Sequence, residues 1–324
     1  MHESAVPSGT KYRTKVTFTK KAEDEELITE QKVQKESFVD RRFVFGEECW
    51  SEVAGHRMRY LRAGSGTPLV LVHGLLGYSF SWRFNWEVLA KEFTVYAVDL
   101  LGIGFSDRPP VGSVPYDLCS TADRMLDWMQ QLGIRNAVLV GTSHGGGLAL
   151  MMAGRDRQQR RGLIGKLVSV AGVNPWTPVG HLRAKIFGHP VGSAVFKMLA
   201  PMLGMARLAM LERMYGDNSR ITQETLEGYR KHLELPRSLD YGIAIARNWQ
   251  RDLACLPEAI EQIDDLPTLL IWGKKDKVVP LVSGQDLNKH LKNAQLEIMD
   301  RSGHLPYEEY PEEFNHILLR FLHQ

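Results

Sequence analysis

The chain has 324 residues, of which 44% are hydrophobic and 24% are charged. These proportions are typical of soluble globular proteins, and they exclude a wholly disordered or collagen-like chain. The 40 Lys and Arg residues face 38 Asp and Glu residues, and the resulting formal charge of +2 provides no long-range field to attract nucleic acid. We therefore expect one large domain or two smaller ones, with no nucleic-acid partner.

The three cysteines, Cys49, Cys119 and Cys255, are scattered and form no C-x-x-C pair. They predict neither a disulfide framework nor a cysteine-based metal or redox site, so we expect no metal and no cofactor. Residues 1–36 contain no apolar stretch of the kind a signal peptide has, and no window is long and apolar enough to span a membrane. The expected location is the cytoplasm; the sequence gives no indication of the oligomeric state.

Residues 1–47 differ in composition from the rest of the chain. They are rich in Lys and Glu and poor in aromatic residues, and only the run near 22–35 has helical spacing. Such a composition supplies little apolar surface for a core. We therefore predict that residues 1–47 are an N-terminal extension.

The rest of the chain alternates strand-like and helix-like patterns. The predicted strands are, in chain order, 51–53, 57–62, 68–73, 94–100, 137–142, 166–173, 267–272 and 294–299. The predicted helices outside the interruption described next are 80–92, 116–132, 143–157, 281–292 and 311–322. This alternation predicts an α/β protein with a mostly parallel sheet that is covered by helices on both faces.

The alternation is interrupted between the sixth and seventh predicted strands. Residues 175–255 look mostly helical and contain no buried-strand pattern. We therefore predict a helical domain at 175–255, inserted into a core formed by residues 48–174 and 256–324.

The strongest local signal is Gly141-Thr142-Ser143-His144-Gly145, between a predicted strand and a predicted helix. A nucleophile on such a tight turn exposes its side chain at the sheet edge, and the turn requires small flanking residues. The helix that follows points its N-terminus at the site and favours developing negative charge there. Ser143 is the predicted nucleophile.

A serine hydroxyl becomes an effective nucleophile only when a base takes its proton. His304 follows the last predicted strand, and Asp276 follows the strand before it. Because parallel strands end at one edge of a sheet, both loops can meet the loop that carries Ser143. We predict that His304 is the base and later the acid, and that Asp276 orients its imidazole and stabilises the imidazolium.

A tetrahedral intermediate also needs hydrogen-bond donors for its oxyanion. We predict that the backbone N–H of His144 is one donor and that of Leu75, in the loop after His73-Gly74, is the second. Leu76 is a further candidate in this loop and is expected to line the substrate pocket. We expect the His73 side chain to brace the loop rather than to take part in the chemistry.

Five motifs together resemble the α/β-hydrolase superfamily. They are HGLLG at 73–77, DLLGIGFSD at 99–107, GTSHGG at 141–146, WGKKDKVVP at 272–280 and SGHLPYEEYP at 302–311. The resemblance implies an α/β-hydrolase fold with a helical cap inserted after strand 6, and the order Ser143, Asp276, His304 is that of its catalytic triad. It is similar to the capped serine hydrolases, which implies a carboxylesterase-like enzyme acting through an acyl-enzyme intermediate.

Single residues distinguish this chain from superfamily members that catalyse other reactions. Its epoxide hydrolases and haloalkane dehalogenases use an aspartate nucleophile, whereas position 143 is serine. Its carbon–carbon bond hydrolases of the meta-cleavage type use Ser-Asp-His but usually carry Trp where this chain has Leu305. That reaction, a cofactor-free perhydrolase and a small-molecule receptor that retains the triad remain alternatives to an ester hydrolase.

The predicted cap contains an unusual methionine-rich stretch. Five of the 12 methionines fall within residues 194–214, namely Met198, Met202, Met205, Met210 and Met214. Methionine adapts to varied apolar shapes, so we predict that Met198, Met202 and Met205 line a pocket for a small hydrophobic ester of short to medium chain length. The charged residues among them argue against a membrane span but allow weak contact with a lipid surface.

Overall fold

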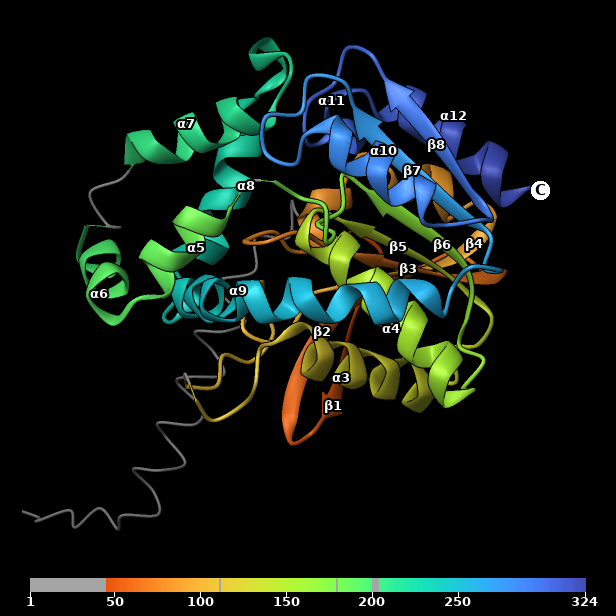
Figure 1. The fold of residues 1–324 in the computed structure, drawn as a ribbon, viewed down its shortest axis with the longest axis horizontal. Coiled ribbons are helices and arrows are strands. Elements are labelled where there is room, and N and C mark those ends of the chain that lie inside the picture. Colours follow the sequence, from red (N-terminus) through yellow and green to blue (C-terminus); the bar gives the residue numbers. More distant parts are fainter. Residues whose placement is uncertain (1–44, 111, 179, 200–203) are drawn as a thin grey trace, which may run out of the picture. The chain divides into compact units, whose positions relative to one another are not determined.

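The computed structural model describes residues 45–324, except for 111, 179 and 200–203 (Figure 1). Nearly all of the predicted N-terminal extension lies outside the described residues. The described residues belong to one compact unit, which includes both predicted core segments and the predicted cap.

Eight strands form a single sheet in the order β1-β2-β4-β3-β5-β6-β7-β8. The strands are β1 (Glu47–Val53), β2 (His56–Ala63), β3 (Thr67–Val72), β4 (Phe93–Val98), β5 (Ala137–Thr142), β6 (Ile164–Val170), β7 (Thr268–Gly273) and β8 (Ala294–Met299). Strand β2 pairs antiparallel with β1 and β4, and every other pair is parallel. The predicted mostly parallel sheet is therefore confirmed, and each predicted strand overlaps an observed one.

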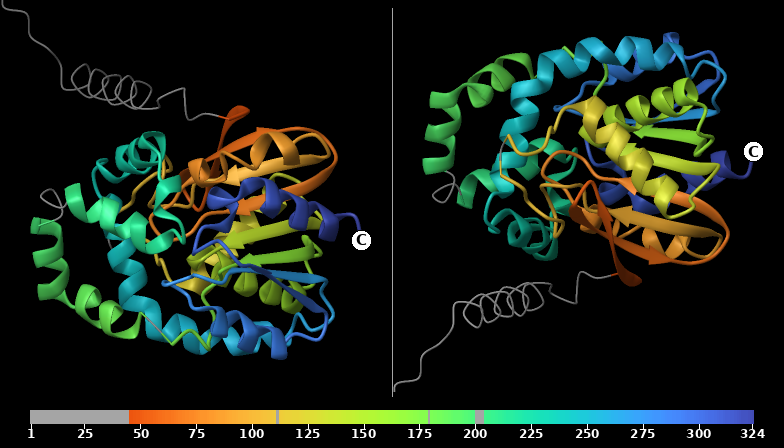
Figure 2. Two further views of the ribbon diagram at one scale, coloured as in Figure 1. Left: turned by 90° about the horizontal axis from the view of Figure 1, so that it is seen from above. Right: turned by 90° about the horizontal axis from the view of Figure 1, so that it is seen from below.

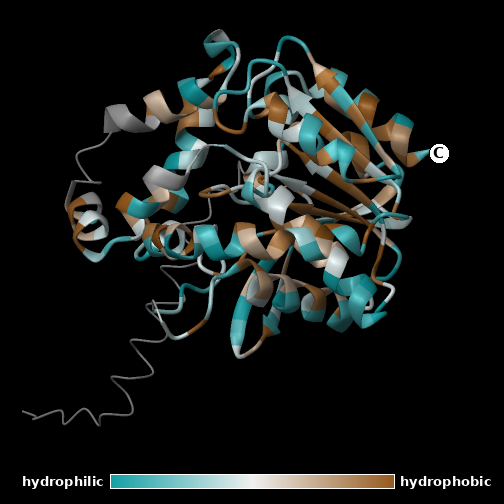
Figure 3. Ribbon diagram, viewed as in Figure 1, coloured by the Kyte–Doolittle hydropathy of each residue, from teal (hydrophilic) through white to brown (hydrophobic). Residues whose placement is uncertain are grey.

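Helices cover both faces of this sheet. The helices of the described residues are η2 (Ser79–Trp82), α2 (Trp86–Leu89), α3 (Leu118–Gln131), α4 (His144–Gln159), α5 (His181–Gly188), α6 (Pro190–Leu199), α7 (Gly204–Met214), η4 (Asn218–Arg220), α8 (Gln223–Leu233), α9 (Ser238–Glu261), α10 (Leu281–Lys289), α11 (Pro306–Glu309) and α12 (Pro311–Leu322). One apolar cluster joins α3, α4, α9 and α10 to the sheet, and a second joins α2 and α12. Strands β4, β5 and β7 are buried along their whole length, as parallel strands covered on both faces must be. Figure 3 shows the corresponding hydrophobic residues gathered along the strands.

The single helix predicted over 80–92 is wrong, because the chain forms η2, a turn and then α2. The turn contains two buried polar side chains, Arg83 and Asn85. Arg83 Nη2 donates to Glu308 Oε2 at 2.8 Å. Asn85 Nδ2 donates to Asn315 Oδ1 at 2.9 Å. These tertiary hydrogen bonds hold the segment in a bent path that its apolar spacing alone does not reveal.

Helices α5 to α9 are inserted between β6 and β7, where the helical insertion was predicted. Both views in Figure 2 place α5 to α8 at one end of the sheet. Helix α9 runs without interruption through position 255, the predicted end of the insertion, and its Leu253 and Leu256 are buried in the same cluster as α4. The insertion is thus anchored to the core by a shared helix. Among the described helices, none combines the length and apolar composition of a membrane span.

Candidate active site

Ser143 lies on the turn between β5 and α4, with φ at +54° and ψ at −121°. A positive φ is unfavourable for a residue with a side chain and is held only when the surroundings enforce it. Here the Ser143 carbonyl accepts hydrogen bonds from the N–H groups of Gly146, Gly147 and Val173. This backbone fixes the direction in which the Ser143 hydroxyl points.

The glycines that flank Ser143 are required by close backbone packing. A Cβ atom added to Gly141 would lie 2.1 Å from the Gly145 oxygen. One added to Gly145 would lie 2.3 Å from the His73 oxygen. The G-x-S-x-G spacing therefore lets the turn pack directly against the end of β3.

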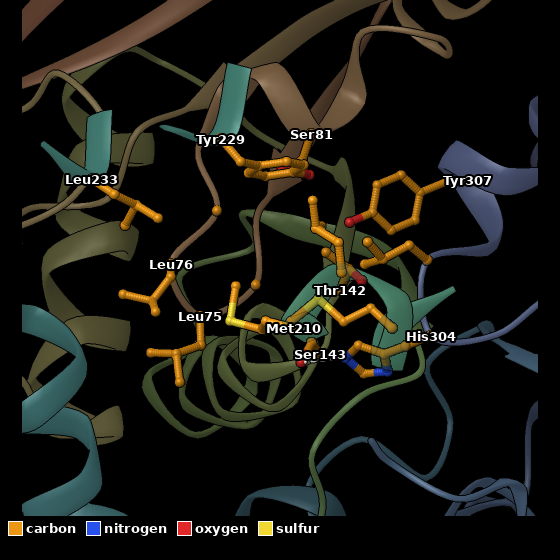
Figure 4. Close-up of a pocket in the computed structure, with 15 residues that line it drawn as sticks. Leu75, Leu76, Ser81, Thr142, Ser143, Met210, Tyr229, Leu233, His304 and Tyr307 are labelled. Carbon is orange, nitrogen blue, oxygen red and sulfur yellow. Dashed lines mark hydrogen bonds between the residues drawn. The ribbon is translucent and has the colours of Figure 1, made fainter. Parts of the chain in front are cut away.

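The structure brings Ser143, His304 and Asp276 into one line. His304 Nε2 lies 2.8 Å from Ser143 Oγ, and His304 Nδ1 lies 2.7 Å from Asp276 Oδ2 (Figure 4 shows the serine–histidine pair). Because a carboxylate only accepts hydrogen bonds, Nδ1 carries the imidazole proton and Nε2 is free to accept the serine proton. Asp276 Oδ1 is held by the N–H groups of Val278 and Val279, at 2.7 and 2.9 Å. The arrangement can thus move a proton away from the Ser143 hydroxyl.

The predicted oxyanion donors, Leu75 and His144, flank Ser143 from two loops. Leu75 lines the same cavity as Ser143, and His144 is the first residue of α4. Within the described part of the chain, no acceptor is found for either backbone N–H. Both groups are therefore available for an oxyanion.

His73 braces the loop that carries Leu75. The Leu100 N–H donates to His73 Nε2 at 3.1 Å, so the ring proton is on Nδ1, which donates to the Gly74 oxygen at 2.8 Å. Burial lowers the pKa of His73, which keeps the ring neutral. A neutral ring with both nitrogens engaged in the backbone fits the expected bracing role.

His144 is adjacent to Ser143 in sequence but cannot serve as its base in this arrangement. Its ring is buried against Tyr241, and no hydrogen-bond partner for either ring nitrogen occurs among the described residues. Burial, with a smaller effect of nearby His73, lowers the pKa of His144 to about 4. Of these two histidines, only His304 is placed to act as the base.

A cavity of about 40 Å³ opens beside Ser143 and His304. Its apolar lining comprises Leu75, Leu76, Met210, Leu211, Met214, Leu233 and Leu305. Its polar lining comprises Ser81, Thr142, Tyr229 and Tyr307 in addition to Ser143 and His304. Leu76 is therefore at the cavity, as predicted, and Figure 4 shows Leu75, Leu76 and Leu233 on one side with Tyr307 on the other.

The predicted methionine lining requires correction. The Met198 side chain is 69% exposed on α6 and does not reach the cavity. Met202 lies outside the described residues, and the side chain of Met205 is also not described. Met210 and Met214 line the cavity instead, because they are one helical turn apart on the face of α7 that packs over the site.

Glu309 joins the His304 loop to the cap and was not anticipated from the sequence. Its Oε1 accepts the Gly303 N–H at 2.7 Å, and its Oε2 accepts those of Gly216 and Asp217 at 2.7 and 3.2 Å. Burial raises the pKa of Glu309 to about 7, although these N–H groups favour the charged form. The only signal in the sequence was its fixed place five residues after His304 in SGHLPYEEYP.

The cap also touches the site through backbone. The His304 N–H donates to the Met214 oxygen at the end of α7, at 2.6 Å. A Cβ on Gly303 would lie 2.5 Å from the Gly216 nitrogen, so only glycine allows this approach. On α8, His232 Nε2 lies 2.9 Å from the Leu76 oxygen. Sequence reasoning gave His232 no role, since its partner is 156 positions away.

A second buried acid, Glu308, lies behind the cavity. Its side chain is fully buried and forms an ion pair with Arg83 at 2.8 Å. The hydroxyls of Tyr215 and Tyr229 donate to the same carboxylate. Nothing in the sequence pattern connected these four residues, because they come from four separate segments.

The chain is similar to known proteins along most of its length. The model of the alpha/beta hydrolase family matches residues 69–317. An uncharacterized protein of Mycobacterium tuberculosis is 31% identical over 278 residues, which cover 83% of this chain and 79% of that protein. A 2-hydroxymuconate semialdehyde hydrolase of a Pseudomonas species is 28% identical over 275 residues, covering 83% and 91% of the two chains.

Solved structures show the same architecture. A meta-cleavage product hydrolase from Pseudomonas fluorescens superimposes with a TM-score of 0.70 at 26% identity, covering 85% of this chain and 97% of that one. A bromoperoxidase from Bacillus anthracis superimposes with a TM-score of 0.73 at 21% identity, covering 86% and 100%. The second likeness concerns the fold alone.

Proposed function

Because the chain belongs to the alpha/beta hydrolase family, we propose that it is a serine hydrolase that cleaves a small hydrophobic carboxylic ester. The observation that carries this proposal is the line from Ser143 through His304 to Asp276, with contacts of 2.8 and 2.7 Å. Such a line activates a serine hydroxyl for acyl transfer.

In the proposed reaction, Ser143 Oγ attacks the ester carbonyl carbon while His304 Nε2 takes its proton. The negative oxygen of the tetrahedral intermediate accepts hydrogen bonds from the Leu75 and His144 N–H groups. His304 then returns the proton to the departing alcohol, leaving an acyl group on Ser143. A water molecule repeats the sequence with His304 as base and releases the acid. Asp276 remains ionised throughout and stabilises the imidazolium.

The cavity supports a short acyl or alcohol group. Its volume of about 40 Å³ gives room for about three water molecules, and most of its lining side chains are apolar. We expect kcat/KM on a p-nitrophenyl ester series to be highest for acyl groups of roughly two to six carbons. An optimum at long chains such as dodecanoate would contradict this pocket.

The second candidate is carbon–carbon bond hydrolysis of the meta-cleavage type, which the names of two similar proteins suggest. A muconate semialdehyde carries a carboxylate, for which a binding site normally supplies Arg or Lys. The residues that line the described cavity include neither, which favours the ester. Cofactor-free perhydrolysis and ligand sensing by a retained triad remain alternatives. Two assays run beside ester turnover distinguish the catalytic alternatives. One measures hydrolysis of a meta-cleavage product, and the other measures peracid formation.

A fluorophosphonate probe tests the nucleophile. Intact protein should be labelled once, and Ser143→Ala should abolish the labelling. Ser283→Ala is the matched control, because Ser283 is also a buried serine but does not line the cavity. Equal labelling of both variants would contradict the assignment of Ser143.

A further inference from the structure

One side of the cavity carries four hydroxyl side chains that the proposed reaction does not use. We refer to Ser81, Thr142, Tyr229 and Tyr307 as the hydroxyl wall. They come from η2, β5, α8 and α11, and all four line the same cavity as Ser143. Figure 4 shows Ser81, Tyr229 and Tyr307 grouped away from Leu75 and Leu76. A pocket built only for alkyl groups would not need this concentration of hydroxyls.

Two members of the hydroxyl wall have unused hydrogen-bonding capacity. Thr142 is fully buried, and its Oγ1 has no partner of hydrogen-bond geometry among the described residues. The Tyr307 hydroxyl lies near those of Thr142 and Ser81, without a well-formed bond to either. Buried hydroxyls are normally paired, so an unpaired one that lines a cavity points to a partner that enters it.

The other two members are held in place from behind. The Tyr229 hydroxyl donates its single proton to the Glu308 carboxylate, and its oxygen lies 3.0 Å from Ser81 Oγ. Since the Tyr229 proton is committed to Glu308, the Ser81 hydroxyl is the donor in the contact between them. These bonds fix the Tyr229 and Ser81 side chains, whereas the Thr142 and Tyr307 hydroxyls have no such anchor behind them.

The charge behind the hydroxyl wall indicates what it can bind. The Glu308 carboxylate is neutralised by Arg83, and no Lys or Arg is among the residues lining the described cavity. A ligand carboxylate would find no cation to pair with among these lining residues. A neutral oxygen, by contrast, could accept hydrogen bonds from Thr142 and Tyr307 without the free-energy cost of burying an unpaired charge.

We propose that the hydroxyl wall recognises a neutral hydrogen-bond acceptor, a keto or ether oxygen, on the part of the ester that enters the cavity. This inference rests on the proposed ester hydrolysis and narrows its substrate class from plain alkyl esters to oxygenated ones. Thr142 and Tyr307 are the specificity-determining donors. Thr142 and Ser143 both line the cavity, so the recognised oxygen and the reacting carbonyl occupy the same pocket.

Two matched ester pairs test the proposal. The first pair is p-nitrophenyl 4-oxopentanoate and p-nitrophenyl 4-methylpentanoate, which differ by a keto oxygen in place of a methyl group. The second is 4-oxopentyl acetate and 4-methylpentyl acetate, which move the same difference to the alcohol. The measured quantity is the ratio of kcat/KM values within a pair, corrected for spontaneous hydrolysis. We expect the wild-type protein to favour the keto ester about fivefold or more in at least one pair.

The variants Thr142→Val and Tyr307→Phe should each reduce that ratio about fivefold, because each removes a donor with little change of shape. Ser283→Ala, outside the cavity, should leave it unchanged. A ratio near one in both wild-type pairs, or a preference that survives both substitutions, would overturn the hydroxyl wall as a recognition site. If the wild-type protein hydrolyses these esters rapidly without such a preference, the proposed ester hydrolysis still stands. If the wild-type protein hydrolyses none of the four esters, the ester proposal itself is overturned.

Discussion

The two sides of the cavity differ in how the chain builds them. The core side consists of strand ends, where Ser143, Asp276 and His304 follow β5, β7 and β8 and meet at one edge of the sheet. The cap side consists of helix faces, where Met210 and Tyr229 reach the cavity from α7 and α8. Strand order brings the first set together, whereas only the packing of helices on the core positions the second. In the proposed function, the chemistry and the hydroxyl donors Thr142 and Tyr307 lie on the core side, whereas the cap side sets which apolar group fits.

The two sides are joined at a few points, and one of these is Glu309. Its carboxylate binds the backbone of the His304 loop and that of the segment after α7. A change in the Ser143–His304–Asp276 triad should therefore abolish turnover, a change at the junction should weaken it, and a change on the cap side should alter the preferred acyl length.

The largest effect is expected on the core side, from Asp276→Asn. The amide cannot hold the required imidazole tautomer, so we expect kcat to fall about 10³–10⁴-fold while KM changes little. Steady-state kinetics on p-nitrophenyl butanoate measure this. A variant that retains more than a tenth of the wild-type kcat would show that Asp276 does not orient His304.

An intermediate effect is expected at the junction, from Glu309→Gln. The amide nitrogen of Gln cannot accept a hydrogen bond, so at least one backbone N–H that now donates to Glu309 would lose its acceptor. This loss should loosen the contact between the His304 loop and the cap. We expect a roughly 10–100-fold loss in kcat with the folded structure retained, as for other groups that orient a reacting residue.

Glu313→Gln is the matched control for Glu309, because Glu313 is a neighbouring glutamate on the same segment whose bond to Arg301 lies at the surface. We expect it to keep wild-type activity. Equal kinetics for the two variants would remove Glu309 from the list of positioning residues.

The same glutamate should make stability depend on pH. Its folded-state pKa is raised from 4.5 to about 7, so the folded protein retains a proton that the unfolded chain releases in this interval. The stability that Glu309 contributes is therefore fully present below pH about 4.5 and is lost as pH rises through about 7. Denaturant unfolding of wild type and Glu309→Gln across pH 4–8 should show this loss in wild type only. A wild-type curve that gains stability over the same interval relative to the variant would contradict the raised pKa.

The smallest effect is expected on the cap side, from Met210→Ala. Truncating a side chain that lines the cavity should enlarge the pocket and shift the preferred acyl length upwards by a few carbons, with a few-fold change in kcat/KM. Met198→Ala is the matched control, because Met198 is 69% exposed and should leave the preference unchanged. A shift caused by Met198→Ala and not by Met210→Ala would reverse the assignment of the cap methionines.

The contrast between the sides also explains what the sequence could reveal. Ser143 was predictable because its turn needs glycines at fixed offsets, and Asp276 and His304 because each follows a strand of the parallel part of the sheet. These are local requirements that leave a pattern in the chain. The sheet and the position of the inserted helices were predictable for the same reason.

Other features depend on contacts between distant segments and left no such pattern. The methionine-rich stretch predicted an apolar cap wall, but which of its methionines faces the cavity depends on how α7 lies on the core. Glu309 looks like an ordinary acidic residue until its partners at 216 and 303 are known. The prediction of one helix over 80–92 was wrong because Arg83 forms a hydrogen bond with a residue 225 positions away in the sequence.

The most direct test of the account is to trap the covalent intermediate. The protein is quenched with acid during turnover of p-nitrophenyl butanoate, digested, and mapped by mass spectrometry, with the Asp276→Asn variant alongside. The account predicts a butanoyl group on the peptide that contains Ser143, and none in Ser143→Ala. Turnover that proceeds with the acyl group on another residue, or that persists in Ser143→Ala, would contradict it.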